Sequence, residues 1–316
     1  MSPFTEFSRH TGRGGLVVGF DGSDSGQRAI QWATAEAHLR EHPLLLVHAH
    51  LAGSTSGWGT IAAPGWGVAA AAFDDAHVRS EIQAQLDRTA RECRMRARAL
   101  DVAAVVAEGQ SPFALVDAAN TVDAELLVVG SSGLGPLLRA MFGSTAADLT
   151  DRTDRPVVVV HDHPAAEGPV VVGVDGTGAS LPALRFAFDH ALRHRCRLHV
   201  VHSVSGVTSD LIASTRFSHN GSVAQPLSDE FLGAWRDLYP TVPVEVDVVD
   251  ERPVDALLRR SAQARLLVVG GRRSTRRSFS RSVSRAAIHR ASCPVAVIPG
   301  TRLATRTQSV PAPRGG

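Results

Sequence analysis

The stretch Leu16–Ser23 reads LVVGFDGS, and the stretch Val170–Thr177 reads VVVGVDGT. In each, a short run of branched apolar residues, typical of a strand buried on both faces of a parallel sheet, ends at a glycine and an aspartate. The two aspartates, Asp21 and Asp175, are 154 residues apart. This spacing indicates that the chain contains the same unit twice.

Further segment pairs repeat at similar offsets, as expected for a duplicated domain. They are LLVH at 45–48 with HVVH at 199–202, Pro112 with Pro253, LLVVG at 126–130 with LLVVG at 266–270, and PVVV at 156–159 with PVAV at 294–297. The predicted organisation is a flexible arm (1–14), a first half (15–161), a polar linker (162–168), a second half (169–300) and a disordered tail (301–316).

Within the first half, short apolar runs alternate with helical patterns. The predicted strands are 15–20, 43–50, 102–107, 124–130 and 156–161, and the predicted helices are the segment around Ala29–Ala37 and residues 74–100, 111–122 and 144–152. Such alternation predicts an α/β fold of two tandem, doubly wound parallel-sheet domains of the Rossmann-like type. Sheets of this kind bind ligands beyond the carboxyl ends of their strands, at the topological switch point.

Composition excludes several classes of function. The chain of 316 residues has a net charge of +2, which argues against a general polyanion binder, and all of its 33 basic residues are arginine. Without lysine there is no Walker-A phosphate loop and no Schiff-base chemistry. No apolar run reaches membrane-spanning length. The cysteines Cys93, Cys196 and Cys293 are widely spaced, so we expect reduced thiols in a cytoplasmic protein.

A glycine-rich segment follows the predicted strand 124–130. It comprises Gly130, Ser131, Ser132, Gly133, Leu134, Gly135 and Pro136, and Gly143, Ser144 and Thr145 then open the predicted helix 144–152. Glycines allow close backbone approach to an anion, and a helix N-terminus offers unpaired N–H groups with a partial positive charge. The segment is thus a candidate cradle for phosphates, and a structural turn is the alternative.

The pattern Gly130-x2-Gly133-x9-Gly143-Ser144, together with Asp21, resembles the nucleotide signature of the ATP-binding universal stress proteins. The resemblance covers nearly the whole chain. It implies the strand order 3-2-1-4-5 and ATP, with or without Mg²⁺, as the cofactor. The nucleoside would lie near Gly19, Asp21, Gly22 and Ser23, with Val47 and Ala49 lining the adenine pocket, while residues 130–135 and 143–145 would hold the phosphates.

The second half departs from this pattern. Arg273 stands where the second glycine is expected, and Arg281 where the third is expected, so we do not expect normal phosphate binding there. The positions expected to contact the nucleoside are still present in the second half, as Gly173, Asp175, Val201 and Ser203. The arginine-rich segment 272–290 contains no acid, and could bind anions through guanidinium groups, bind nucleic acid or form a solvated surface.

The resemblance implies a regulatory module in which ATP occupancy changes shape or the choice of a protein partner. The alternatives are an enzyme that slowly hydrolyses ATP or adenylates a substrate, and a nucleic-acid binder acting through the second-half arginines. Residues 130–145 contain no acid to serve as a general base, which argues against a fast enzyme. The two halves are expected to pair as an internal pseudo-dimer through 156–161 and 294–299, and a homodimer is also open.

Other residues have two interpretations each. Asp21 could contact the ligand or cap the following helix, a role that Asp24 or Ser25 could also fill. His48 and His50 share a strand face and are interpreted as packing residues rather than metal ligands. Cys93 is interpreted as a buried apolar residue rather than a nucleophile. The segment 51–73 could form a lid or a mobile loop.

Overall fold

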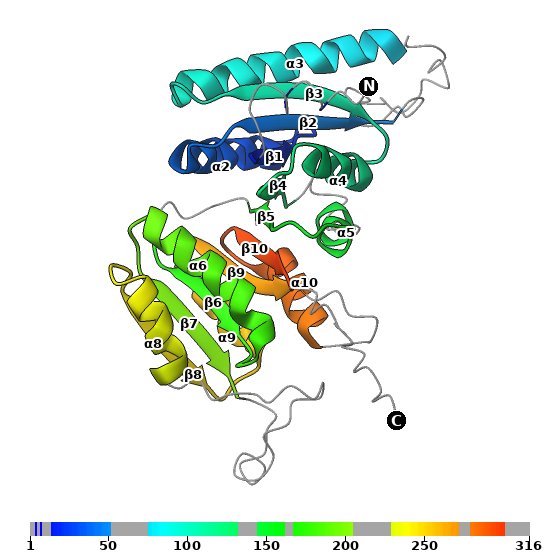
Figure 1. The fold of residues 1–316 in the computed structure, drawn as a ribbon. Helices are drawn as coiled ribbons and strands as arrows, with labels where there is room; N and C mark the ends of the chain where they lie inside the picture. Colours follow the sequence, from blue (N-terminus) through cyan, green and yellow to red (C-terminus); the bar gives the residue numbers. More distant parts are fainter. Residues whose placement is uncertain are drawn as a thin grey trace, which may run out of the picture.

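The computed structural model describes residues 4, 7, 14–51, 75–131, 144–161, 167–204, 229–271 and 279–300. In this part of the chain the two halves share one ten-stranded sheet in the order β3-β2-β1-β4-β5-β10-β9-β6-β7-β8. Figure 1 shows the first half above the second, with β5 and β10 where they meet.

The first half follows the predicted alternation closely. Its elements are β1 (Leu16–Gly19), α2 (Asp24–Arg40), β2 (Leu44–His50), α3 (Asp75–Arg96), β3 (Val102–Glu108), α4 (Ser111–Thr121), β4 (Leu126–Gly130), α5 (Ser144–Arg152) and β5 (Val157–Val160). The helix predicted over 74–100 ends at Arg96 because the chain turns there, and Ala99 adopts a positive φ of 72°.

The second half repeats this order with one addition. Its elements are β6 (Val170–Val174), the 3-10 turn η2 (Gly178–Ser180), α6 (Leu181–Arg193), β7 (Leu198–Ser203), α8 (Asp229–Leu238), β8 (Val244–Val249), α9 (Pro253–Ser261), β9 (Leu266–Gly271), α10 (Phe279–Arg290) and β10 (Val295–Pro299). The short 3-10 turn precedes α6, whereas α2 begins directly as an α-helix.

Each half has the strand order 3-2-1-4-5, which confirms the fold predicted from the sequence. The strands run parallel within a half, and β5 pairs antiparallel with β10, where Val158 lies opposite Ala296. The valine-rich last strands therefore cover each other instead of leaving two exposed edges.

Alternating side chains of the strands build two core layers, one on each face of the sheet. Leu16 and Val18 of β1 pack beneath α2 and α3, in a layer that continues under α6 and α8. Val17 points to the opposite face, which α4, α5, α9 and α10 cover. Both faces are apolar because helices cover both, as is usual for parallel sheets.

The N-terminal segment differs in part from the flexible arm expected from the sequence. Phe4 and Phe7 are buried, with exposed fractions of 2% and 6%, and belong to the core layer that includes α4. Two aromatic side chains bury enough apolar surface to hold a short segment against a domain.

Within the described ranges, no helix combines the length and apolar character needed to cross a membrane.

Candidate functional site

A cleft opens at the carboxyl ends of β1, β2 and β4. Its lining residues are Gly19, Phe20, Asp21, Ser25, Gly26, Val47, Ala49, Ser111, Leu115, Val129, Gly130 and Thr145. Strands β1 and β4 pair here although more than a hundred residues separate them in the chain. The chain first adds β2 and β3 on one side of β1 and then returns to add β4 and β5 on the other side. The cleft therefore lies at the switch point of the sheet, where open α/β sheets bind ligands.

The structure brings several of the predicted site residues together around this cleft. Those lining it are Gly19, Asp21, Val47, Ala49, Gly130 and Thr145. Gly22 and Ser23 form the turn between β1 and α2, beside the lining residues, and Ser131 follows the end of β4 with its N–H donating to the Val160 carbonyl at 2.9 Å. Ser144 begins helix α5. The predicted residues that lie outside the described part are Ser132, Gly133, Leu134, Gly135, Pro136 and Gly143.

Asp21 organises the start of helix α2 and also lines the cleft. Its Oδ1 accepts hydrogen bonds from the backbone N–H of Ser23 at 3.0 Å and from the Ser23 hydroxyl at 2.6 Å. Ser23 in turn accepts from the Gly26 N–H at 3.0 Å and is the N-cap of α2. The capping role thus belongs to Ser23 rather than to Asp24 or Ser25, and the exposed Asp21 carboxylate holds that cap in place.

Three glycines permit close approach at the floor of the cleft. A Cβ on Gly130 would lie 2.7 Å from the backbone carbonyl carbon and oxygen of Ser25, and a Cβ on Gly26 would lie 2.7 Å from Asp21 Oδ1. A Cβ on Gly19 would lie 3.0 Å from Leu115 Cδ1. These positions therefore exclude any larger residue without movement of the backbone or of packed side chains.

Three helices present their first turns to the cleft. Ser25 belongs to α2, Ser111 to α4 and Thr145 to α5. Unpaired N–H groups and the helix dipole favour an anion at such ends. The first turns of α4 and α5 contain no acidic residue, whereas α2 carries Asp24 there. A negatively charged group is thus favoured on the side of α4 and α5.

The opposite part of the cleft is apolar. Val47, Leu115 and Val129 are almost fully buried beneath it, and Phe20 borders it. Such a wall suits a flat, weakly polar group, while the hydroxyls and Asp21 supply polar contacts. The arrangement combines an apolar wall, one carboxylate and helix N-termini within a single cleft.

Sequence reasoning missed half of the lining residues. These are Phe20, Ser25, Gly26, Ser111, Leu115 and Val129. Phe20, Ser25 and Gly26 adjoin Asp21 in sequence, so the predicted turn after the first strand was a usable signal. Ser111 and Leu115 gave none, because only the packing of α4 against β1 and β2 brings them to the cleft.

The corresponding region of the second half is arranged differently. Asp175 Oδ1 accepts from the N–H of Thr177 at 3.0 Å, from the Thr177 hydroxyl at 2.7 Å and from the Ser180 hydroxyl. Ser180 stands 154 residues after Gly26, so the second half carries a side chain at the position where the first half has a glycine packed closely against Asp21. Among the described residues, a Cβ on Gly270 would meet nothing within 4 Å, so the start of the η2–α6 segment does not pack against β9 as closely as α2 packs against β4.

The other predicted second-half residues keep their places in the repeat. A Cβ on Gly173 would lie 2.9 Å from Leu257 Cδ1, much as Gly19 faces Leu115. Val201 is buried, and the Ser203 hydroxyl donates to the Glu251 carbonyl. Of the arginine-rich segment 272–290, residues 272–278, with Arg273, lie outside the described part, and residues 279–290 form α10.

Among the histidines and cysteines that the sequence singled out, His48, Cys93 and Cys293 are buried in the fold. His48 Nδ1 lies 2.8 Å from the Phe20 carbonyl, and His202 Nδ1 lies 3.1 Å from the Val174 carbonyl, so the pair repeats between the halves. Burial lowers the pKa of His48. Burial also raises the pKa of the Cys93 thiol, and that of Cys293 to about 12, which makes both poor nucleophiles at neutral pH.

Comparison with known proteins gives consistent results. The model of the universal stress protein family matches residues 15–161 and 168–299. A universal stress protein of Mycobacterium tuberculosis (strain ATCC 25618 / H37Rv) is 35% identical over 291 residues, covering 90% of this chain and 96% of that protein. The crystal structure of a universal stress protein from Archaeoglobus fulgidus DSM 4304 aligns with 91% of this chain and 97% of its own, at 16% identity and a TM-score of 0.64. A universal stress protein solved in complex with cAMP aligns with 48% of this chain and 98% of its own, at 27% identity and a TM-score of 0.35.

Proposed function

Because the chain belongs to the universal stress protein family, we propose that its first half binds ATP, with or without Mg²⁺, and that the protein is a nucleotide-dependent regulatory module. The observation that carries this proposal is the cleft at the switch point between β1 and β4. It combines an apolar wall, the Asp21 carboxylate and the first turns of three helices.

The position of each group sets the orientation of the nucleotide. The base packs against Val47 and Ala49, where the wall is apolar, and Asp21 accepts hydrogen bonds from hydroxyls of the ribose. The phosphates extend toward Gly130 and Thr145, away from the Asp21 carboxylate. Backbone N–H groups at the start of α5 and the glycine-rich sequence after Gly130 then replace the lysine that the chain lacks.

The second half has a different role in this proposal. The Ser180 side chain fills the space next to Asp175, and Arg273 and Arg281 replace glycines of the phosphate segment. Arginine cannot supply the close backbone approach that phosphate binding by N–H groups requires. We therefore expect one ATP per chain, held in the first half.

The proposed site stores ATP rather than turning it over rapidly. The sequence from Gly130 to Thr145 contains no acid to orient or deprotonate an attacking water. We expect phosphate release well below about 1 per second, the low end of typical enzyme turnover. ATP occupancy would instead order the cleft and so change which protein partner the module binds. The three free thiols fit a reducing compartment such as the cytoplasm.

Isothermal titration calorimetry with ATP on the full chain tests the proposal, with Asp21→Ala and Asp175→Ala as a matched pair. We expect one site per chain in the wild type. Loss of charge-assisted hydrogen bonds worth about 1.5–3 kcal/mol should weaken binding in Asp21→Ala by roughly 10- to 100-fold. Asp175→Ala should bind ATP as the wild type does. Two equal sites, no binding, or an unchanged affinity in Asp21→Ala would contradict the assignment.

A further inference from the structure

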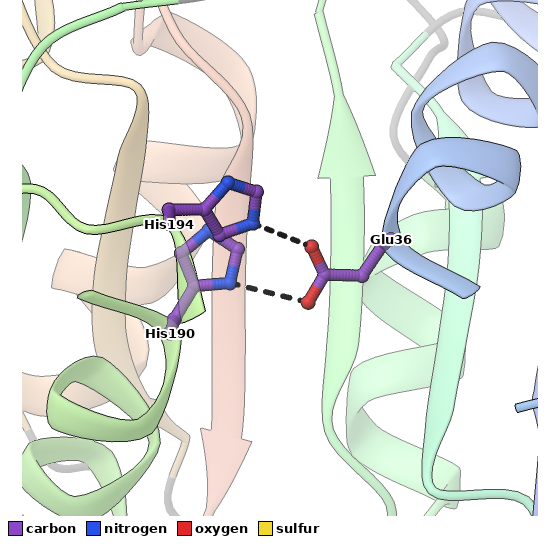
Figure 2. Close-up of side chains that lie close together, drawn as sticks. All are labelled: Glu36, His190 and His194. Carbon is purple, nitrogen blue, oxygen red and sulfur yellow. Dashed lines mark hydrogen bonds and ion pairs between the residues drawn. The ribbon is translucent and has the colours of Figure 1, made fainter. Parts of the chain in front are cut away.

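A cluster of three side chains joins the two halves on the face of the sheet covered by α2 and α6. Glu36 comes from α2, His190 lies in the last turn of α6, and His194 is the C-cap residue of that helix (Figure 2). Glu36 and His190 are each only 2% exposed, and His194 is 16% exposed. A buried carboxylate facing two imidazoles is uncommon, because each group loses its hydration on burial.

The duplication of the chain explains why these residues meet. Glu36 and His190 are separated by the same 154 residues that relate Asp21 to Asp175, and Arg40 and His194 are separated likewise. The two helices therefore present equivalent faces to each other across the β5–β10 seam. One face carries an acid, and the other carries two imidazoles at positions i and i+4, which lie on the same side of a helix.

Arg40 fixes the Glu36 carboxylate from the side of the first half. Its Nε donates to Glu36 Oε1 at 2.6 Å, and its NH1 lies 3.7 Å from Glu125 Oε2, so the arginine charge has a second partner. Glu36 Oε2 faces the second half, where His194 Nε2 lies 2.8 Å away. Hydrogen-bonded support of this kind orients a carboxylate that ligates a metal.

Within the described ranges, the Nδ1 atom of His190 is a buried ring nitrogen of this cluster that makes no hydrogen bond. It lies 3.4 Å from Glu36 Oε1. The rings of Trp32 and Phe186 stack against His190 with centroids 6.3 Å and 6.2 Å away, which limits its movement. The only described polar contact of His190 Nδ1 is this long ion pair with Glu36, so a metal ion between the three side chains would give the buried nitrogen a closer partner.

We propose that Glu36, His190 and His194 bind a Zn²⁺ ion that links the two halves, with a water molecule as the fourth ligand. Glu36 Oε2, His190 Nδ1 and His194 Nε2 would be the protein ligands. One ligand atom from each of the three residues lies within 4.8 Å of the other two. Tetrahedral coordination at about 2.0–2.1 Å requires ligand atoms about 3.4 Å apart, so modest side-chain shifts suffice.

The chemistry of the donors selects the class of ion. Imidazole favours zinc and neighbouring transition metals, whereas Mg²⁺ and Ca²⁺ prefer sites built only from oxygen. The partial exposure of His194 provides a path for the ion and its water.

The competing interpretation is a cluster that holds the halves together by direct hydrogen bonds alone. The test uses the full chain without a histidine tag, stripped with a chelator, dialysed and titrated with Zn²⁺ by calorimetry, with zinc content measured by mass spectrometry. His194→Gln removes one ligand at the more exposed position. His199→Gln is the matched control, because His199 also pairs with an acid, Asp247 at 3.2 Å, but lies outside the cluster.

We expect one zinc per wild-type chain. Loss of an outer-shell partner typically weakens metal binding by about 10–100-fold. Loss of a direct ligand in His194→Gln should weaken zinc affinity by more than that, and His199→Gln should bind zinc as the wild type does. Since His194→Gln could also weaken the seam itself, Co²⁺ added to the stripped wild type gives an independent readout, the visible absorption of a tetrahedral site. No zinc retention, equal affinity in His194→Gln, or an octahedral Co²⁺ spectrum would overturn the proposal.

Discussion

The two halves share their strand order and the aspartate that ends their first strand, yet they differ in the first turn of the helix that follows. In the first half, Gly26 lines the cleft and packs so closely against Asp21 that a Cβ there would lie 2.7 Å from Asp21 Oδ1. In the second half, Ser180 occupies the equivalent position and donates its hydroxyl to Asp175. The helix there is preceded by a 3-10 turn, and no described residue lies within 4 Å of a Cβ placed on Gly270, whereas one on Gly130 would overlap Ser25.

This comparison separates what builds the sheet from what builds the site. The strands and the glycine turns are alike, since Gly22 and Gly176 both adopt a positive φ, of 82° and 71°. The site depends instead on whether the helix can approach the end of the fourth strand closely. In the second half the Ser180 hydroxymethyl group lies next to the aspartate and is hydrogen-bonded to it, whereas the first half has no side chain at that position.

The largest predicted effect concerns the seam that the halves share. Val158 of β5 is fully buried and lies in register between Val128 and Ala296. Val158→Asp would bury a charge with no partner, and we expect a loss of at least about 4 kcal/mol in the free energy of unfolding. Both halves should lose stability together, as measured by chemical denaturation and size-exclusion chromatography.

Val248→Asp is the control for this change. Val248 is 58% exposed on β8, so the same charge should cost little there. Wild-type stability and size in Val158→Asp would show that the halves do not depend on their common sheet, and each would then have to be treated as a separate unit.

The second prediction concerns the close contact that distinguishes the two sites. A Cβ on Gly130 would overlap the Ser25 backbone, so Gly130→Ala should cost about 1–3 kcal/mol through overpacking. At roughly 2–4 °C per kcal/mol, the melting midpoint should fall by several degrees. Gly270→Ala should stay within about 0.5 kcal/mol of the wild type. Differential scanning calorimetry on both variants gives the comparison, and equal effects would mean that the helices approach their strands alike.

Most of the fold could be predicted from the sequence because buried parallel strands have a simple pattern. The second strand, predicted over 43–50, is observed as Leu44–His50, and the last, predicted over 156–161, as Val157–Val160. The strand order came from a resemblance to a family rather than from the residues alone. The burial of Phe4 and Phe7 was not predicted, because two isolated aromatic residues in a polar segment give no periodic signal.

The site was predictable only where its residues lie next to a motif. Asp21 and Gly130 follow strands whose carboxyl ends share an edge of the sheet, so sequence position implied spatial position. Leu115 enters the cleft through tertiary packing of α4, which no local pattern encodes. The i, i+4 spacing of His190 and His194 is visible in the sequence, but the partner Glu36 could be identified only by applying the repeat offset to the helices.

The smallest predicted effect comes from removing the serine that closes the second-half site. Ser180→Gly deletes the two hydrogen bonds between the Ser180 hydroxyl and Asp175, each worth about 1 kcal/mol, and gives the position the residue type of Gly26. We expect a slightly lower melting midpoint and still one ATP per chain by calorimetry, because Arg273 and Arg281 continue to replace glycines of the phosphate segment. Gly26→Ser is the reciprocal change, and it should weaken ATP binding, since its hydroxyl would enter the space beside Asp21. A second ATP bound by Ser180→Gly would show that the serine alone closes this site, and that the arginines are compatible with phosphate binding.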